Sequence, residues 1–86
     1  MEDMARIRKI TSPWGFENIR RTKAEYRFCK SVLEREAQSL AELIDDMEKH
    51  HGFAREDWYE RRGACLYAIS YCEFALASSA EEDELF

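Results

Sequence analysis

The sequence is poor in the residues that interrupt secondary structure. Only three Gly and one Pro occur among its 86 residues. Because Gly and Pro are the main residues that break helices and form tight turns, their scarcity predicts few, long elements. Long uncharged apolar runs are missing as well. We therefore expect neither a secretory signal peptide nor a membrane-spanning helix, and predict a cytoplasmic protein without membrane contact.

Metal-binding and redox patterns are also missing. Cys29, Cys65 and Cys72 include no CxxC pair, and in a reducing compartment such thiols behave as small core residues. His50 and His51 are adjacent, and adjacent helix positions do not face one another. We expect one of these histidines to bond the last carbonyls of a helix instead. The sequence predicts no metal and no cofactor.

Catalytic motifs do not occur either. The sequence has no Gly-rich phosphate loop, no HExxH and no ordered Ser, His and Asp set. Glu73 is the only charge in the run GACLYAISYCEFALASSA. It is either a buried acid with a raised pKa or an ion-pair partner of Lys30 or Arg35, and we favour the ion pair. We predict that the protein is not an enzyme and has no catalytic residues.

A first long helix is predicted from apolar residues that recur every seven positions. These residues are Ile19, Tyr26, Leu33, Leu40 and Met47. A second set lies three residues after each of them and comprises Thr22, Cys29, Glu36, Leu43 and His50. Val32, Ala37 and Ile44 widen this apolar stripe. Gly52 follows basic and titratable residues and predicts the C-terminal end of the helix. The N-cap is left open between Ser12 and Asn18.

A second helix is predicted from alternating spacings of four and three residues. The positions are Trp58, Arg62, Cys65, Ile69, Cys72, Leu76 and Ser79. A parallel stripe of aromatic residues consists of Tyr67, Tyr71 and Phe74. A helix that is apolar nearly all the way round is buried on more than one side.

The short link HGFA makes the two helices antiparallel neighbours. The predicted fold is all-α, a long antiparallel helical hairpin of about 17–51 and 55–80. One hairpin cannot cover both faces of its second helix. The arm offers apolar cover, but we favour a second copy, which forms a homodimeric four-helix bundle through Tyr67, Tyr71 and Phe74. The predicted divisions are an N-terminal arm 1–16, a hairpin domain 17–80 and an acidic C-terminal tail 81–86.

Charge is distributed unevenly along the chain. Residues 1–35 hold nine of the 13 Lys and Arg but only five of the 18 acids. The basic patch consists of Arg20, Arg21, Lys23, Arg27 and Lys30. An acidic face near the turn consists of Glu42, Asp45, Asp46, Glu48, Glu56 and Asp57. Basic groups among aromatic residues bind nucleic acid, and acidic groups attract basic partners. For both sets we favour a solvated helix face.

The tail EEDELF comprises Glu81, Glu82, Asp83, Glu84, Leu85 and Phe86. Acids followed by two apolar residues can dock in a basic-rimmed apolar pocket of a protein partner. The tail resembles the C-terminal tips of bacterial single-stranded-DNA-binding proteins and, more weakly, sliding-clamp-binding peptides. The oligonucleotide-binding domain, Gly-rich linker and leading Gln of those proteins are missing, so no function is carried over. Docking on the basic patch of the same chain or its dimer mate is an alternative, and a solubilising end is favoured.

The predicted function is a small non-enzymatic protein-binding regulator or inhibitor that acts by covering its partner. One concrete version is a phage or mobile-element inhibitor of a host defence nuclease. The first alternative is a nucleic-acid-binding regulator that uses the basic N-terminal half. The second is a structural subunit of a larger complex.

Overall fold

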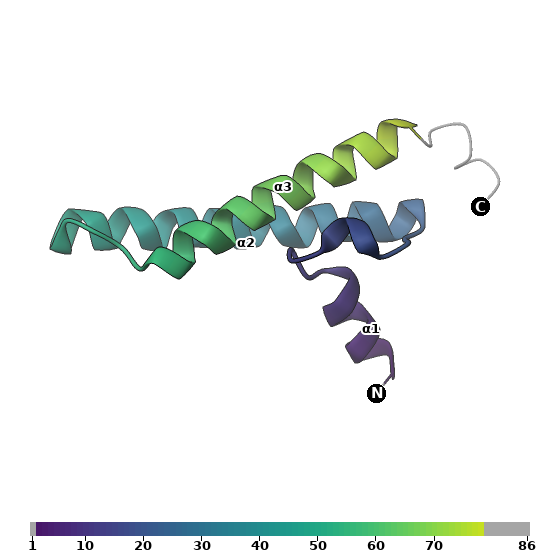
Figure 1. Cartoon of the computed structure of the whole chain (residues 1–86), viewed down its shortest axis with the longest axis horizontal. Helices are drawn as coiled ribbons and strands as arrows, with labels where there is room; N and C mark the ends of the chain where they lie inside the picture. Colours follow the sequence, from purple (N-terminus) through teal and green to yellow (C-terminus); the bar gives the residue numbers. More distant parts are fainter. Residues whose placement is uncertain (1, 79–86) are drawn as a thin grey trace.

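The computed structural model describes residues 2–78, with side chains described from Met4 onward. In chain order the elements are α1 (Glu2–Ile10), the 3-10 helix η1 (Phe16–Asn18), α2 (Lys23–His51) and α3 (Glu56–Ser78). The two long helices α2 and α3 form an antiparallel hairpin, and α1 projects from the side of α2 (Figure 1). The predicted all-α hairpin is therefore confirmed within the described residues.

The first long helix starts later than the predicted position near residue 17. Thr22 is its N-cap: the Thr22 hydroxyl accepts from the Glu25 amide at 3.1 Å, and the Glu25 carboxylate accepts from the Thr22 amide at 2.9 Å. This reciprocal arrangement is a capping box, and its Thr-x-x-Glu signal is present in the sequence. Before it, Gly15 is left-handed (φ 63°) and Ile19 is extended. Neither backbone conformation continues a helix, so the predicted caps Ser12 and Asn18 are wrong.

The opposite end of α2 agrees with the prediction. Gly52 adopts the left-handed conformation with φ 82°, and its amide donates to the Glu48 carbonyl at 2.8 Å. His50 Nδ1 lies 2.9 Å from the Asp46 carbonyl oxygen. These contacts satisfy carbonyls that a helix end would otherwise leave without a partner.

The core of the hairpin follows the 3.6-residue period more closely than the heptad. Leu33 and Leu40 are buried as predicted, and so are Ala37 and Ile44, which take the core positions that the strict heptad gives to Glu36 and Leu43. Leu43 is 48% exposed instead. A straight helix drifts by about 20° per heptad relative to a 3.5-residue repeat, so the contact stripe moves from residue 36 to 37 and from 43 to 44.

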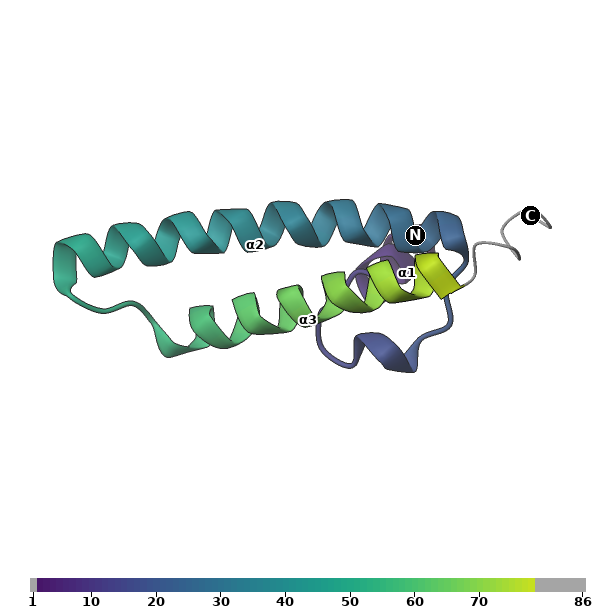
Figure 2. The same ribbon diagram turned by 90° about the horizontal axis from the view of Figure 1, so that it is seen from above.

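The N-terminal arm covers one end of the hairpin, a larger part than predicted. Phe16 of η1 is fully buried, and its ring lies 5.9 Å from Tyr71 and 6.4 Å from Tyr26, measured between ring centroids. Figure 2 shows η1 beside the C-terminal half of α3. The arm does not cover all of α3, because Tyr67 and Phe74 remain 54% and 62% exposed.

None of the helices in residues 2–78 is long and apolar enough to cross a membrane.

Candidate functional site

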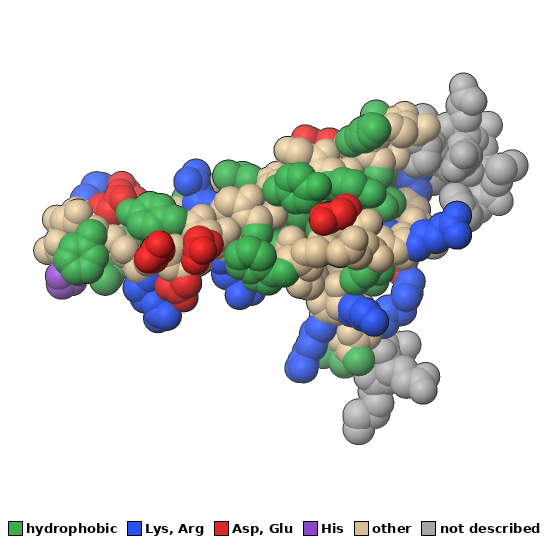
Figure 3. Space-filling view, viewed as in Figure 1, with side chains coloured by type: hydrophobic (Ala, Val, Ile, Leu, Met, Phe, Trp, Pro, Cys, Tyr) green, Lys and Arg blue, Asp and Glu red, His purple; other side chains and the backbone are tan. Residues whose placement is uncertain are grey.

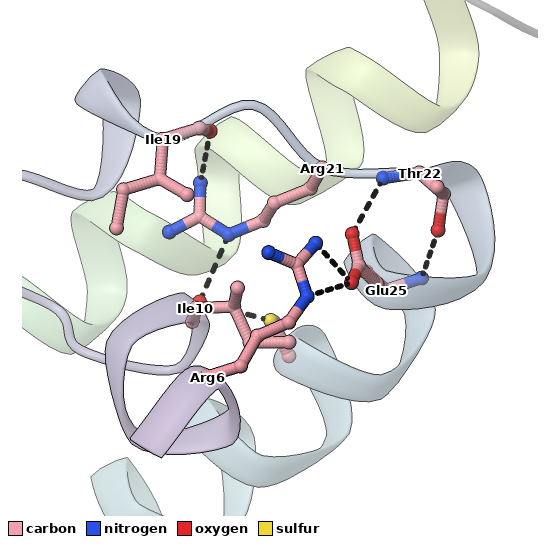
Figure 4. Close-up of polar contacts among 7 residues, drawn as sticks. Arg6, Ile10, Ile19, Arg21, Thr22 and Glu25 are labelled. Atoms are coloured by element: carbon pink, nitrogen blue, oxygen red, sulfur yellow. Dashed lines mark hydrogen bonds and ion pairs between the residues drawn. The ribbon is translucent and has the colours of Figure 1, made fainter. Parts of the chain in front are cut away.

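Arg21 belongs to the interior and not to the predicted basic surface. It is only 8% exposed, and its guanidinium donates to the carbonyls of Ile10 and Ile19 at 2.8 Å (Figure 4). It also donates to the Phe16 carbonyl. The guanidinium carbon also lies 3.5 Å from the Phe16 ring centroid. A planar guanidinium suits this combination of several acceptors and a ring face. Arg21 thus holds the end of α1, η1 and the start of α2 together.

The rest of the basic patch is also divided. Lys30 forms ion pairs with Glu73 at 3.6 Å and with Glu34 at 3.9 Å. The predicted Glu73 pairing is confirmed, and the exposed Glu73 carboxylate is not a buried acid. Lys23 and Arg27 have interactions of their own, and Arg20 is exposed. The five residues therefore do not present one continuous basic face.

The three cysteines are buried thiols, as predicted. Burial is the main cause that raises the pKa of Cys65 and of Cys72 to about 11, with smaller contributions from Glu36 at Cys65 and from Cys29 at Cys72. Burial also raises the pKa of Cys29, whose thiol donates to the Ile10 carbonyl at 3.1 Å. A thiol with a raised pKa is protonated at neutral pH and is a poor nucleophile. Within residues 4–78 no cluster of three or more His, Cys, Asp or Glu side chains is arranged to hold a metal ion.

The acidic face lies around the hairpin turn together with exposed apolar side chains. Phe53, which follows the turn glycine Gly52, is 69% exposed, and Leu43 in the C-terminal half of α2 is 48% exposed. Most of the predicted acids contact close neighbours. The contacts join Glu42 to Gln38, Asp45 to Lys49, Asp46 to His50, Glu48 to Tyr59 and Asp57 to Arg55. Apolar and acidic groups share this end in Figure 3. We call residues 42–59 the hairpin tip.

The outer face of α3 is a second apolar surface. Tyr67 and Phe74 are exposed there, and Figure 3 shows apolar side chains at the surface over α3. Leu66 is also exposed, but it lines a recess together with Ala37 and Ala41 of α2. Tyr71, which we predicted in the same stripe, packs instead against Phe16 and Tyr26. The predicted aromatic stripe therefore divides between the core and the surface.

A third surface, between α1 and α2, was not predicted from the sequence. A groove of about 490 Å³ is lined mainly by the apolar side chains of Ile7, Ile10, Ala24 and Phe28. Arg6 and Glu25 form an ion pair of 2.7 Å at its edge. The sequence signal was Phe28, an aromatic residue off the main apolar stripe of α2. The position of α1 depends on the buried Arg21, which the sequence pattern does not reveal.

The groove continues into a basic recess at the start of α2. The recess has a volume of about 360 Å³ and shares Arg6 and Glu25 with the groove. Its other lining residues are Arg20, Arg21 and Thr22. Three arginines against one glutamate give this recess a positive charge.

The predicted tail residues 81–86 lie outside the described part of the chain.

Comparisons with protein-family models, with curated proteins and with solved structures found no match. The functional argument therefore depends on the surfaces of this chain alone.

Proposed function

We propose that the protein is a small non-enzymatic regulator that binds another protein and acts by covering part of its surface. The observation that supports this proposal is the exposure of ten large apolar side chains within residues 4–78. Large apolar side chains that gather on an exposed surface mark interaction sites in soluble proteins. The three surfaces described above account for most of these side chains.

The outer face of α3 is the proposed contact with a second copy of the chain. A chain of 86 residues is near the size at which one core is only marginally stabilising, so association adds needed burial. Packing Tyr67 and Phe74 of one hairpin against those of another gives a dimeric four-helix bundle with a twofold interface.

The hairpin tip is the proposed contact with a different protein. Phe53 and Leu43 supply apolar area, and the surrounding carboxylates supply negative charge. This combination complements an apolar surface with a basic rim, because opposite charges speed encounter and apolar anchors supply affinity. A nuclease surface that normally holds phosphates has this chemistry, which supports the inhibitor version of the proposal.

Light scattering of the full chain tests the dimer. At micromolar concentration we expect the mass of a dimer for the wild type and of a monomer for Tyr67→Ser/Phe74→Ser. Leu43→Ser is the control, because Leu43 is comparably exposed but belongs to the tip, and this variant should remain dimeric. A monomeric wild type contradicts the proposed interface.

Affinity capture from a lysate tests the tip. We expect a wild-type chain to capture a specific protein that Leu43→Ser/Phe53→Ser loses, while both chains keep the same mass and helix content. If the partner is a nuclease, an equimolar amount of wild type should suppress its cleavage. Equal capture by both chains contradicts the assignment of the tip.

A further inference from the structure

The groove between α1 and α2 and the basic recess beside it form one surface with two chemical parts. The groove is apolar, and the recess carries Arg6, Arg20 and Arg21. Phe28 is 46% exposed in the groove and Ile7 is also exposed. These apolar side chains are in contact with water in the open groove. A segment that entered the groove would remove them from water, which is favourable.

The order of these two parts matches the order of residues in the tail. Four acidic residues, 81–84, come first and Leu85 and Phe86 follow. The recess lies at the Thr22 cap, and the groove extends from there towards Phe28. A segment that runs from the recess into the groove would meet arginines first and apolar side chains second.

The end of α3 lies at the correct end of the hairpin to deliver this segment. The Lys30–Glu73 ion pair and the 6.3 Å separation of the Tyr26 and Tyr71 rings place the last turns of α3 beside the first turns of α2. Figures 1 and 2 show the C-terminus of α3 and the start of α2 at the same end of the hairpin, with the last turns of α3 diverging from α2 on the side opposite to α1 in Figure 1. Six residues lie between Ser78 and Leu85, and an extended chain over that span reaches about 23 Å. A helix is about 10–12 Å across, so the tail reaches round α2.

We infer that residues 81–86 of this chain dock on this surface. The acids of the tail lie over Arg6 and Arg20, and Leu85 and Phe86 enter the groove against Ile7, Ile10 and Phe28. A tail held in this way is withheld from an external partner until that partner competes for it. The inference does not depend on the proposed dimer or on the hairpin tip, since it uses a different surface.

Nuclear Overhauser measurements on the full chain test the docking directly. We expect cross-peaks between the Phe86 ring and the methyl groups of Ile7 and Ile10. Phe28→Ser should remove these cross-peaks, because it removes one wall of the groove. Phe53→Ser is the matched control, since it replaces an exposed Phe at the hairpin tip, and it should leave them unchanged.

A second readout uses chemical shifts and does not need the Phe86 ring. Leu85→Ser/Phe86→Ser should shift the methyl signals of Ile7 and leave those of Ile44, which is buried near the hairpin turn, in place. Arg20→Glu should produce the same shift, because it repels the acids of the tail. Unchanged Ile7 signals in both variants overturn the inference.

An equimolar mixture of labelled and unlabelled chains identifies the source of the tail. Docking within one chain gives no cross-peaks between labelled and unlabelled molecules. Cross-peaks between molecules show that a second copy supplies the tail, and this result overturns the assignment to the same chain. Complete absence of Phe86 cross-peaks from both samples overturns docking itself.

Discussion

The guanidinium of Arg21 stacks on the Phe16 ring at 3.5 Å and at the same time donates to the Phe16 carbonyl. Phe16 therefore supplies both the ring face and one of the hydrogen-bond acceptors for the buried positive charge of Arg21. Arg21 also bonds the carbonyls of Ile10 and Ile19. Among the described residues its Nη2 is the one buried side-chain nitrogen or oxygen without a hydrogen-bond partner. The contact fixes the arm, and the arm forms one wall of the groove.

Replacing Arg21 should destabilise the protein much more than replacing the residue before it. Arg21→Met removes the guanidinium donor from three carbonyls, of which that of Ile10 keeps only the Cys29 thiol. We expect a loss of about 3 kcal/mol in the free energy of unfolding. Arg20→Met is the control, and a change within about 0.5 kcal/mol is expected because Arg20 is exposed. Urea denaturation followed by circular dichroism measures both. Equal losses for the two variants would show that Arg21 does not hold the arm.

The two glycines of the hairpin should respond in opposite directions to alanine. At Gly52 the backbone has φ 82°, so Gly52→Ala is strained although no atom lies within 4 Å of the added Cβ. We expect a loss of about 1 kcal/mol. Gly63 lies inside α3, also with nothing within 4 Å, and Gly63→Ala should gain about 0.8 kcal/mol from higher helix propensity. Thermal unfolding of both variants checks the opposite signs, and a stabilised Gly52→Ala would contradict the left-handed cap.

The Glu25 carboxylate should make stability depend on pH in the acid range. The Thr22 amide holds the pKa of Glu25 below its usual value of 4.5, assisted by Arg6. A carboxylate whose pKa is lower in the folded state than in the unfolded state stabilises the fold fully above pH 4.5. That contribution is lost as the pH falls through the lower, folded-state value. Glu25→Gln should therefore differ from the wild type in urea denaturation at neutral pH and approach it in acid. A constant difference would show that the capping box is not ionised as described.

The buried thiols should make the protein unstable in alkali. Burial raises the pKa of Cys72 from 9.0 to about 11, so the folded state retains its proton where the unfolded state loses it. This proton stabilises the folded state fully below pH 9.0, and the stabilisation is lost as the pH rises towards about 11. Cys72→Ala should reduce the steepness of alkaline unfolding, whatever its effect on stability at neutral pH. Unchanged steepness would contradict the protonated, buried thiol.

Parts of the site were predictable because their signals are local in the sequence. The turn after His51 was identified from Gly52, and the pairing of Glu73 with Lys30 followed from one charge in an apolar run. The start of α2 was missed although Thr22 and Glu25 carry its signal. Three competing caps were present, and only the extended backbone at Ile19 excludes the earlier ones.

The sequence by itself determined that the chain forms two long helices and that these two pair, whereas the helices α1 and η1 within the predicted arm were missed. Those features depend on spacing, short links and the scarcity of Gly and Pro, which act over a few residues. Only the tertiary structure decided that Arg21 is buried and that Phe16 is fully covered, because a charged residue is buried only where several distant acceptors converge. The groove beside α2 follows from that convergence. The groove forms because α1 packs beside α2, and residue spacing along the sequence does not encode a contact between two separate segments.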